Sequence, residues 1–91
     1  MSATTTYAVL VEVTLRPGIA DPEGATIVRA LPALGFDEVH GVSVGKSIRF
    51  EIDAADEASA RARVEELCEH FLTNPVIEDA TIHVEVAGVA A

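Results

Sequence analysis

Cysteine is nearly absent from this sequence of 91 residues, in which Cys68 stands alone. A single thiol forms no disulfide within the chain and builds no cysteine-based metal site. Aromatic residues are also scarce, at 4%, and tryptophan is missing, whereas hydrophobic residues make up 49%. The chain therefore has the material for an aliphatic core, and disorder is expected only at its ends.

Basic residues are the next shortage, with 6 Lys and Arg against 15 Asp and Glu and a formal net charge of −9. The sequence has no basic stripe that could displace counterions from nucleic acid, and an anionic membrane surface would repel it. We therefore expect no nucleic-acid partner and no membrane partner. A basic protein surface, in contrast, would attract this chain.

Long apolar runs are lacking too, because no stretch approaches the roughly 20 residues that a transmembrane helix needs. The start, MSATTT, does not place an apolar run behind a basic region, so we expect no secretory signal and a cytoplasmic protein. The length predicts one domain over residues 1–91, with an ordered core at about 6–87. Such a chain buries roughly 60–65% of its unfolded surface, so association with another chain would stabilise it.

Four stretches have the alternation or the β-branched content of strands. The predicted strands are Thr6–Arg16, Val39–Val44, Ser47–Ile52 and a last one that ends near Val86. Pro17-Gly18 ends the first of them. Gly45-Lys46 lies between the second and the third, which indicates a hairpin turn.

Two helices are predicted between these strands. The first begins at Asp21-Pro22-Glu23, because aspartate is a good cap and proline suits the first helical position. It ends near Gly35, where Phe36 is expected to fold back and make the hydrophobic contact of a Schellman motif with Leu31. The second helix runs from a cap at Asp56 to Asn74-Pro75. Its predicted core-facing stripe is Ala60, Val64, Leu67, Cys68 and Phe71.

The resulting element order, β-α-β-β-α-β, is typical of a ferredoxin-like α+β sandwich with two layers. We expect an antiparallel sheet with two helices on one face. The opposite face is predicted to carry Leu10, Glu12, Thr14, Arg49, Glu51, His83 and Glu85. This face is too polar for a second core, and it is suited to pairing with another chain.

Reactive groups do not converge in the sequence. His40, His70 and His83 fall on three different elements without ligand spacing, so surface histidines explain them better than a metal site. Cys68 lies on the apolar stripe, which predicts an inert core thiol. The glycines form no phosphate-binding loop, and adjacent acids such as Glu65-Glu66 are typical of a solvated face. We predict no catalytic, cofactor-binding or metal-binding residues.

Five short motifs are similar, in order and spacing, to the PurS family. They are Asp21-Pro22-Glu23-Gly24, Leu31–Phe36, Val44-Gly45-Lys46, Glu66-Leu67-Cys68-Glu69 and Asn74-Pro75-Val76-Ile77-Glu78-Asp79. The resemblance covers about Thr6 to Val86. The third and the fifth motif, about 30 residues apart, are together specific.

PurS is the small subunit of phosphoribosylformylglycinamidine synthase, so the resemblance implies a part in de novo purine biosynthesis. There, nitrogen from glutamine replaces the amide oxygen of formylglycinamide ribonucleotide. The resemblance implies a complex that uses ATP, Mg²⁺ and glutamine, none of them bound by this chain, which has no activity alone. It also implies a homodimer or higher oligomer. That oligomer would join the glutaminase subunit to the large synthetase subunit and help ammonia pass between them.

Two segments are candidate subunit contacts: Val44, Gly45 and Lys46, and Asn74, Pro75, Val76, Ile77, Glu78 and Asp79. Each has a structural alternative. Lys46 is either a contact or a solvated turn residue, and Ile77 either docks a partner or closes the core beneath the second helix. Two other functions stay open on element order alone. One is a small-molecule regulatory domain of the ACT type, and the other is an acylphosphatase-like hydrolase, which needs an arginine such as Arg16 to bind an anion.

Overall fold

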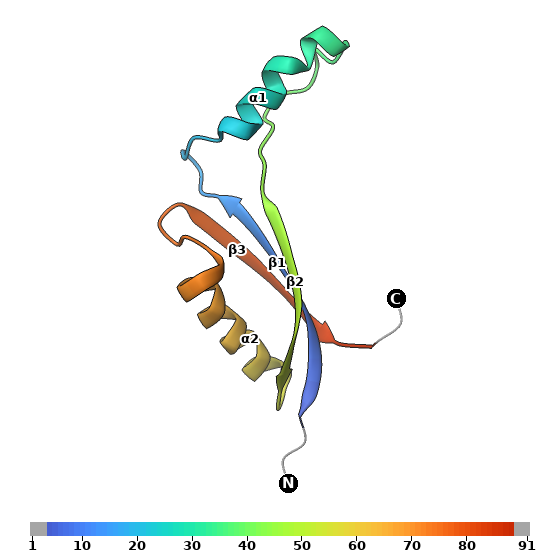
Figure 1. Cartoon of the computed structure of the whole chain (residues 1–91), viewed down its shortest axis with the longest axis vertical. Coiled ribbons are helices and arrows are strands. Elements are labelled where there is room, and N and C mark those ends of the chain that lie inside the picture. The colour runs from blue at the N-terminus through green and yellow to red at the C-terminus, as the bar shows by residue number, and fades with distance from the viewer. Residues whose placement is uncertain (1–3, 89–91) are drawn as a thin grey trace.

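One antiparallel sheet organises the computed structural model, which describes residues 4–88. Its strands are β1 (Thr5–Leu15), β2 (Lys46–Ala54) and β3 (Glu78–Val86), in the order β2-β1-β3. Figure 1 shows β1 between its two neighbours. The ends of the predicted 1–91 domain, and most of the loose tail predicted after Ala87, lie outside the described residues.

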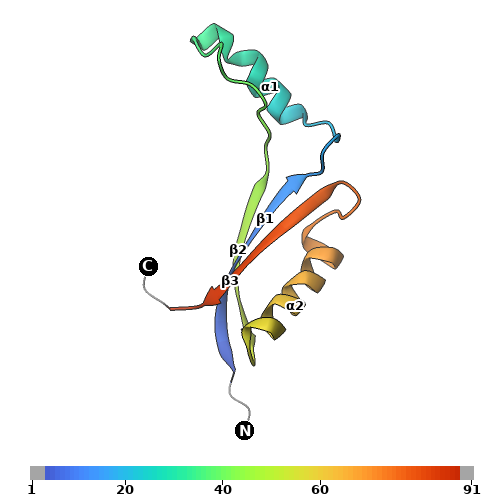
Figure 2. The ribbon, with the colours of Figure 1, turned by 180° about the vertical axis from the view of Figure 1, so that it is seen from behind.

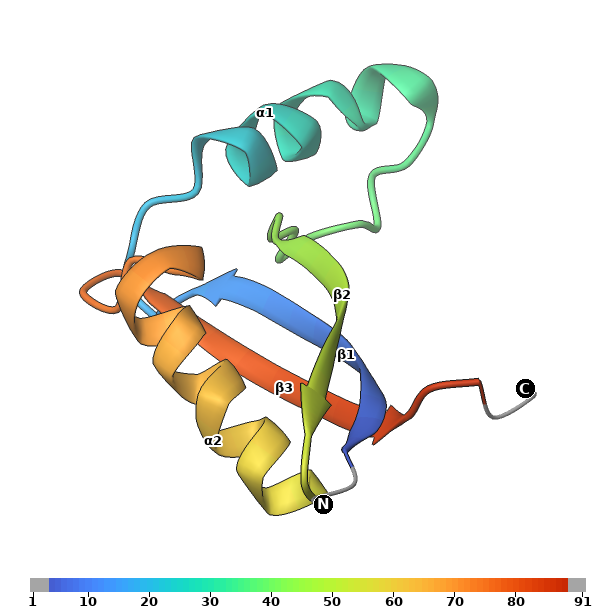
Figure 3. The ribbon, with the colours of Figure 1, turned by 60° about the horizontal axis from the view of Figure 1, so that its bottom comes forward.

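Helix α2 (Glu57–Leu67) covers one face of this sheet (Figure 3). The helix begins at the predicted residue, because Asp56 Oδ1 accepts a hydrogen bond of 2.7 Å from the backbone nitrogen of Ser59. The buried cluster beneath it consists of Val9, Val11, Val13, Val64 and Cys68, with Ile48, Phe50, Ile52, Leu72, Ile82 and Val84 packed against it. The alternation predicted for the first strand is thereby confirmed.

The second helix does not end as a regular α-helix. Its last turn, Cys68–Leu72, is π-helical, and the backbone nitrogen of Thr73 donates to the carbonyl oxygen of Cys68 at 3.0 Å. The wider turn changes the direction of the following side chains relative to a repeat of 3.6 residues. Leu72 therefore packs against the core, whereas Phe71, which was predicted to lie there, is 80% exposed.

Residues 19–44, which we call the arm, project beyond the end of the sheet (Figures 1 and 2). Helix α1 (Pro22–Ala30) begins at the predicted cap, and a short 3₁₀-helix (Pro32–Leu34) follows it. Gly35 has a φ of 91°, and the backbone nitrogen of Phe36 donates to the carbonyl oxygen of Leu31 at 3.0 Å. This is the hydrogen bond of the predicted Schellman motif.

The strand predicted at Val39–Val44 does not form, and with it the hairpin at Gly45-Lys46 is lost. Over residues 4–88 the element order is β-α-β-α-β. The segment before β2 continues the line of that strand past the end of β1 (Figure 1), so no strand lies beside it to share hydrogen bonds. Helix α1 lies away from the sheet, and α2 alone covers the face where both helices were expected. The α+β class and the antiparallel sheet are confirmed.

The arm makes the chain thin and elongated. Its principal extents are 62 × 33 × 14 Å, and the radius of gyration of its Cα atoms is 17.5 Å. A compact domain of this length has a radius of about 12 Å. A single chain therefore leaves the arm and the open face of the sheet largely uncovered. Within residues 4–88, no helix is both long and apolar enough to cross a membrane.

Candidate subunit-contact site

The two predicted contact segments meet at one end of the sheet. Lys46 at the start of β2 pairs with Val13, and Glu78 at the start of β3 pairs with Leu15. Both side chains border a recess of about 250 Å³, which we call the sheet-end recess; its lining also includes Val13, Leu15, Asp21, Pro22, Glu23, Val44 and Gly45. Antiparallel pairing of both strands with β1 thus brings together two segments that the sequence suggested separately.

Val44 holds the two ends of the arm together, and Gly45 connects the arm to β2. The backbone nitrogen of Val44 donates to Asp21 Oδ2 at 2.8 Å. A Cβ atom on Gly45 would lie 2.5 Å from the carbonyl oxygen of Val13, which no side chain can tolerate. Glycine is therefore needed here for the close approach of two backbones and not for a turn. Lys46, in contrast, is exposed, and it is the cationic residue in a lining that also holds Asp21, Glu23 and Glu78.

Asn74 builds the turn between the second helix and β3. Its Oδ1 accepts from the backbone nitrogen of Val76 at 3.1 Å, and its carbonyl oxygen accepts from those of Ile77 and Glu78 at 3.1 and 2.8 Å. Glu78 Oε1 accepts in return from the backbone nitrogen of Asn74 at 2.8 Å. These hydrogen bonds fix the backbone of the turn, a common use of asparagine. Val76 at its tip is left 77% exposed.

Arg16 ties this turn to the end of β1. Its backbone nitrogen donates to the carbonyl oxygen of Ile77 at 2.8 Å, and its Nε lies 3.4 Å from Glu78 O and 3.3 Å from Asp79 Oδ1. An exposed ion pair contributes only about 0–1 kcal/mol, so its main effect is to orient the turn. The sequence does not predict this role, because no local pattern relates Arg16 to a carbonyl group 62 positions later. The same contacts engage the Arg16 side chain with the turn at the start of β3.

The predicted segment at 74–79 thus has two kinds of residue. Ile77 and Glu78 are half-buried, and the side chains of Asn74 and Glu78 hold the turn together. Pro75, Val76 and Asp79 are exposed. Direct contact of any of these residues with another subunit stays a prediction.

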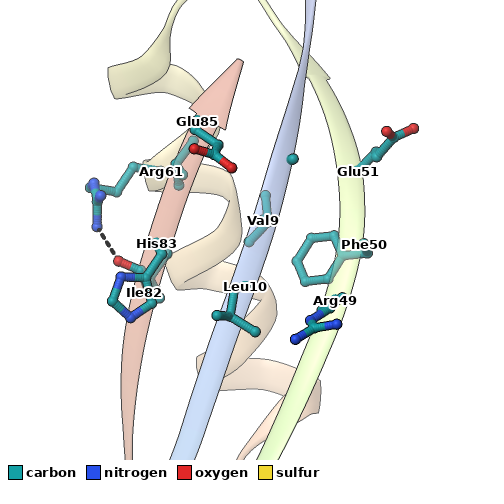
Figure 4. A pocket seen from close by; sticks show the side chains of 11 residues that line it. Val9, Leu10, Arg49, Phe50, Glu51, Arg61, Ile82, His83 and Glu85 are labelled. Carbon is teal, nitrogen blue, oxygen red and sulfur yellow. Dashed lines mark hydrogen bonds between the residues drawn. The ribbon is translucent and has the colours of Figure 1, made fainter. Parts of the chain in front are cut away.

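The open face of the sheet carries two rows of side chains with opposite charge. Because odd-numbered residues of β1 are buried, its even-numbered residues face away from α2. Residues paired across strands share a face, which gives the first row, Arg49-Leu10-His83, and the second row, Glu51-Ala8-Glu85. Figure 4 shows members of both rows around a hollow of about 760 Å³. The expected polar face therefore has a definite charge pattern.

The groups weighed for chemistry lie apart from one another. His83 Nε2 lies 2.9 Å from Glu12 Oε1 on the open face. Among the described residues, no three His, Cys, Asp or Glu side chains gather into a group that could hold a metal ion. Cys68 is buried as predicted, with 5% of its surface exposed. Burial raises the pKa of its thiol, and the charge of Glu65 adds to this effect, so the reactive thiolate is disfavoured.

A sheet with one uncovered face, a projecting arm and a recess built from two rigid segments define a small α+β protein that presents surfaces to other chains. Residues 8–86 match the model of the PurS family, described as phosphoribosylformylglycinamidine (FGAM) synthase. The chain belongs to this family, as its five motifs predicted.

Several known proteins are similar to this chain over nearly their whole length. The phosphoribosylformylglycinamidine synthase subunit PurS of Methanocaldococcus jannaschii is 42% identical over 79 residues, which are 87% of this chain and 95% of the relative. The crystal structure of PurS from the same organism aligns with a TM-score of 0.79 over 88% of this chain and 96% of that chain. A chain in the structure of PurLQS from Thermotoga maritima is 31% identical, with a TM-score of 0.80 over 88% of this chain and 98% of that one.

Proposed function

We propose that this chain is an assembly subunit of a phosphoribosylformylglycinamidine synthase, which acts in de novo purine biosynthesis. The observation that carries this proposal is the likeness to a chain in the Thermotoga maritima PurLQS structure, which covers 88% of this chain and 98% of that one. In this role the chain joins a glutaminase subunit, which releases ammonia, to a synthetase subunit, which activates the substrate amide. The complex works in the cytoplasm and uses ATP, Mg²⁺ and glutamine bound by the other subunits.

The sheet-end recess supports this role. Lys46 and Val76 are both exposed, and both stand on backbone that is fixed at several points. A contact surface that is rigid before binding loses little conformational entropy when a partner docks. We assign Lys46 and Val76 as contacts, whereas the side chains of Asn74 and Glu78 hold the surface in shape.

We infer further that the chain acts as a homodimer. The radius of gyration of 17.5 Å exceeds the value of about 12 Å for a compact domain, so a single copy has little core for its length. The arm exposes several large hydrophobic side chains: Ile27 at 42%, Leu34 at 69%, Phe36 at 49% and Val39 at 38%. Apolar side chains gathered on a projecting element are typical of a surface that another chain covers.

The charge rows of the open face favour a symmetric pairing. A two-fold axis that runs parallel to the rows, between them and above the face, lays the first row of one copy over the second row of its partner. Arg49 then faces the partner's Glu51, and His83 faces the partner's Glu85. Such an interface is isologous, and its complementary charges fix the relative orientation of the two copies.

Reconstitution from purified subunits tests the assembly role. With glutamine and ADP present, we expect this chain to elute from a sizing column together with the synthetase and the glutaminase. Omitting the chain should abolish glutamine-dependent amidine formation and leave the reaction with free ammonia, because ammonia in solution needs no transfer between subunits. Elution of the chain by itself would contradict the proposal, as would turnover of formylglycinamide ribonucleotide by this chain alone.

A further inference from the structure

Three exposed apolar side chains lie on the segment where the second helix runs into β3, outside the core. Leu67, Phe71 and Val76 are 37%, 80% and 77% exposed. We call these three residues the Phe71 surface. Single exposed hydrophobic side chains are ordinary on proteins. Here, however, the most exposed aromatic residue of the described chain lies five positions from an almost equally exposed valine, on one short segment.

The exposure of Phe71 is built into the backbone. The carbonyl oxygen of Cys68 accepts from both the backbone nitrogen and the Oγ1 of Thr73, at 3.0 and 2.9 Å. These two hydrogen bonds close the π-turn that moves Leu72 into the core position and Phe71 out of it. Single π-turns within helices are rare and frequently lie at functional sites. The phenyl ring is therefore held outward by a defined structure and not by a frayed helix end.

The charges around the Phe71 surface indicate what can cover it. Between Glu65 and Asp79 the sequence has five acidic residues, Glu65, Glu66, Glu69, Glu78 and Asp79, and no lysine or arginine. Glu66 pairs with Arg63 at 3.2 Å and Asp79 with Arg16 at 3.3 Å, which leaves three of these acids without an ion pair among the described residues. A second copy in symmetric contact would bring those three against their own counterparts, which costs association energy. A partner with basic side chains around an apolar pocket has the complementary chemistry.

We propose that the Phe71 surface docks on the synthetase subunit, with the phenyl ring in an apolar pocket ringed by lysine and arginine. This inference rests on the proposed function. The synthetase needs basic side chains for the phosphate of its phosphoribosyl substrate, and we expect basic side chains on its docking face as well. The surface is separate from the charge rows of the open face, so one copy can bind a second copy and the synthetase at the same time. Buried aromatic anchors with a polar rim are the usual source of binding energy in such contacts.

Binding of the synthetase to Phe71 variants tests the anchor. The dissociation constant is measured by surface plasmon resonance with glutaminase, glutamine and ADP present, for the wild type, Phe71→Ser and Phe71→Leu. We expect Phe71→Ser to raise the constant about tenfold or more, because truncated anchors commonly cost that much affinity. Phe71→Leu keeps an apolar group in the pocket and should stay within a few-fold of the wild type. Circular dichroism and sedimentation should be the same for all three.

A charge reversal tests the acidic rim. Glu69→Lys should weaken binding several-fold at low salt, and the difference from the wild type should shrink as added salt screens the charges. Glu57→Lys makes the same change of charge at an exposed position at the start of α2. This matched control should bind the synthetase as the wild type does, at every salt concentration.

Each outcome decides between the two proposals. If the wild type does not bind the synthetase, the proposed function and the docking surface are both overturned. If the wild type binds and Phe71→Ser binds equally well, the docking surface is wrong and the assembly role stands. The docking surface is also overturned if Phe71→Ser weakens self-association in sedimentation, since a second copy would then cover it. The docking surface is overturned as well if Phe71→Ser no longer binds the glutaminase and still binds the synthetase.

Discussion

The carboxylate of Asp21 holds the backbone of Val44, a residue 23 positions away, through a hydrogen bond of 2.8 Å to Oδ2. Its other oxygen, Oδ1, accepts from the backbone nitrogen of Gly24 at 2.8 Å and caps helix α1. One side chain thus starts the outgoing helix of the arm and secures the returning segment at the edge of the sheet-end recess. Both bonds hold the arm together at the point where it leaves and rejoins the sheet.

Asp21→Asn should keep one of these two hydrogen bonds and break the other. An amide keeps one acceptor oxygen, which can still cap α1, but its nitrogen is a donor and cannot accept from Val44. We expect hydrogen exchange of the Val44 amide, followed by NMR, to speed up while the Gly24 amide stays protected. Asp21→Ala should expose both amides. Equal protection of Val44 in the wild type and in Asp21→Asn would show that the bond does not hold the arm.

Acid should weaken the same connection. The hydrogen bond from Gly24, and secondarily that from Val44, lower the pKa of Asp21 from its ordinary value of 3.8. A carboxyl group with a lowered pKa in the folded state adds stability above its unfolded pKa, and this stability is lost as the pH falls through the folded value. We expect the difference in Tm between the wild type and Asp21→Asn to be largest near neutral pH and to decrease as the pH falls below the ordinary value of 3.8. A difference that does not change with pH would contradict the assignment.

Swapping the charges of the open face should test the symmetric dimer. Arg49→Glu places an acid opposite the partner's Glu51 twice in the dimer, and Glu51→Arg creates the same repulsion with the opposite sign. We expect each single change to raise the dissociation constant of the dimer roughly tenfold in sedimentation at low salt. The double variant exchanges the two charges and restores the pairing, so it should associate like the wild type. Failure of the double variant to recover would place the interface elsewhere, and a wild type that stays monomeric would refute the dimer itself.

The position of Cys68 predicts its reactivity. With 5% of its surface exposed and the pKa of its thiol raised by burial, it should react slowly with a thiol reagent in the native protein and fast in denaturant. Cys68→Ala removes only one buried sulfur atom, so we expect a loss of about 1–2 kcal/mol in the free energy of unfolding and intact assembly. Rapid labelling of the native protein would mean that the π-turn opens in solution.

Local signals explain why much of this fold could be predicted from the sequence. The alternation of Tyr7, Val9, Val11 and Val13 depends only on the period of a strand, and the caps at Asp21 and Asp56 depend on neighbours three positions away. These features depend only on short stretches of the sequence, and the structure confirms them. The family assignment succeeded for a similar reason, because five motifs in a fixed order need no knowledge of contacts.

The errors arise where distant residues decide. Val39–Val44 has the composition of a strand, but a strand needs a partner. The pairing between β1 and the chain around β2 stops at Val13 and Lys46, so β1 does not pair with this segment. Gly45 suggested a hairpin turn. Glycine is required at this position for another reason, because a Cβ atom would collide with the carbonyl oxygen of Val13. Phe71 has the spacing of the predicted core-facing stripe. The hydrogen bonds from Thr73 to the carbonyl oxygen of Cys68, however, close a π-turn that places Phe71 outside the core. The recess that joins Lys46 to Glu78 could not be foreseen either, since it depends on the register of both edge strands.

Lys46 offers the most direct separation of fold from function. Its side chain is exposed, and the recess that it borders also holds Asp21, Glu23 and Glu78. Exposed substitutions usually change stability by less than about 0.5 kcal/mol, whereas charge reversal at a contact can cost several kcal/mol of association. We therefore expect Lys46→Glu to keep its circular dichroism spectrum and to need a higher concentration for half-maximal glutamine-dependent amidine formation in the reconstituted complex.

Lys46→Gln is the control that makes this result interpretable. Lys46→Glu also adds an acid to an acidic recess, so local repulsion alone could disturb the end of the sheet. Lys46→Gln removes the positive charge without adding a negative one, and a true contact predicts a smaller shift in the same direction with no change in Tm. If Lys46→Gln matches the wild type and Lys46→Glu lowers both Tm and activity, the effect is repulsion within the recess. If both variants match the wild type throughout the titration, Lys46 is a solvated residue at the start of β2, and the contacts at this end of the sheet lie with Val76 and its neighbours.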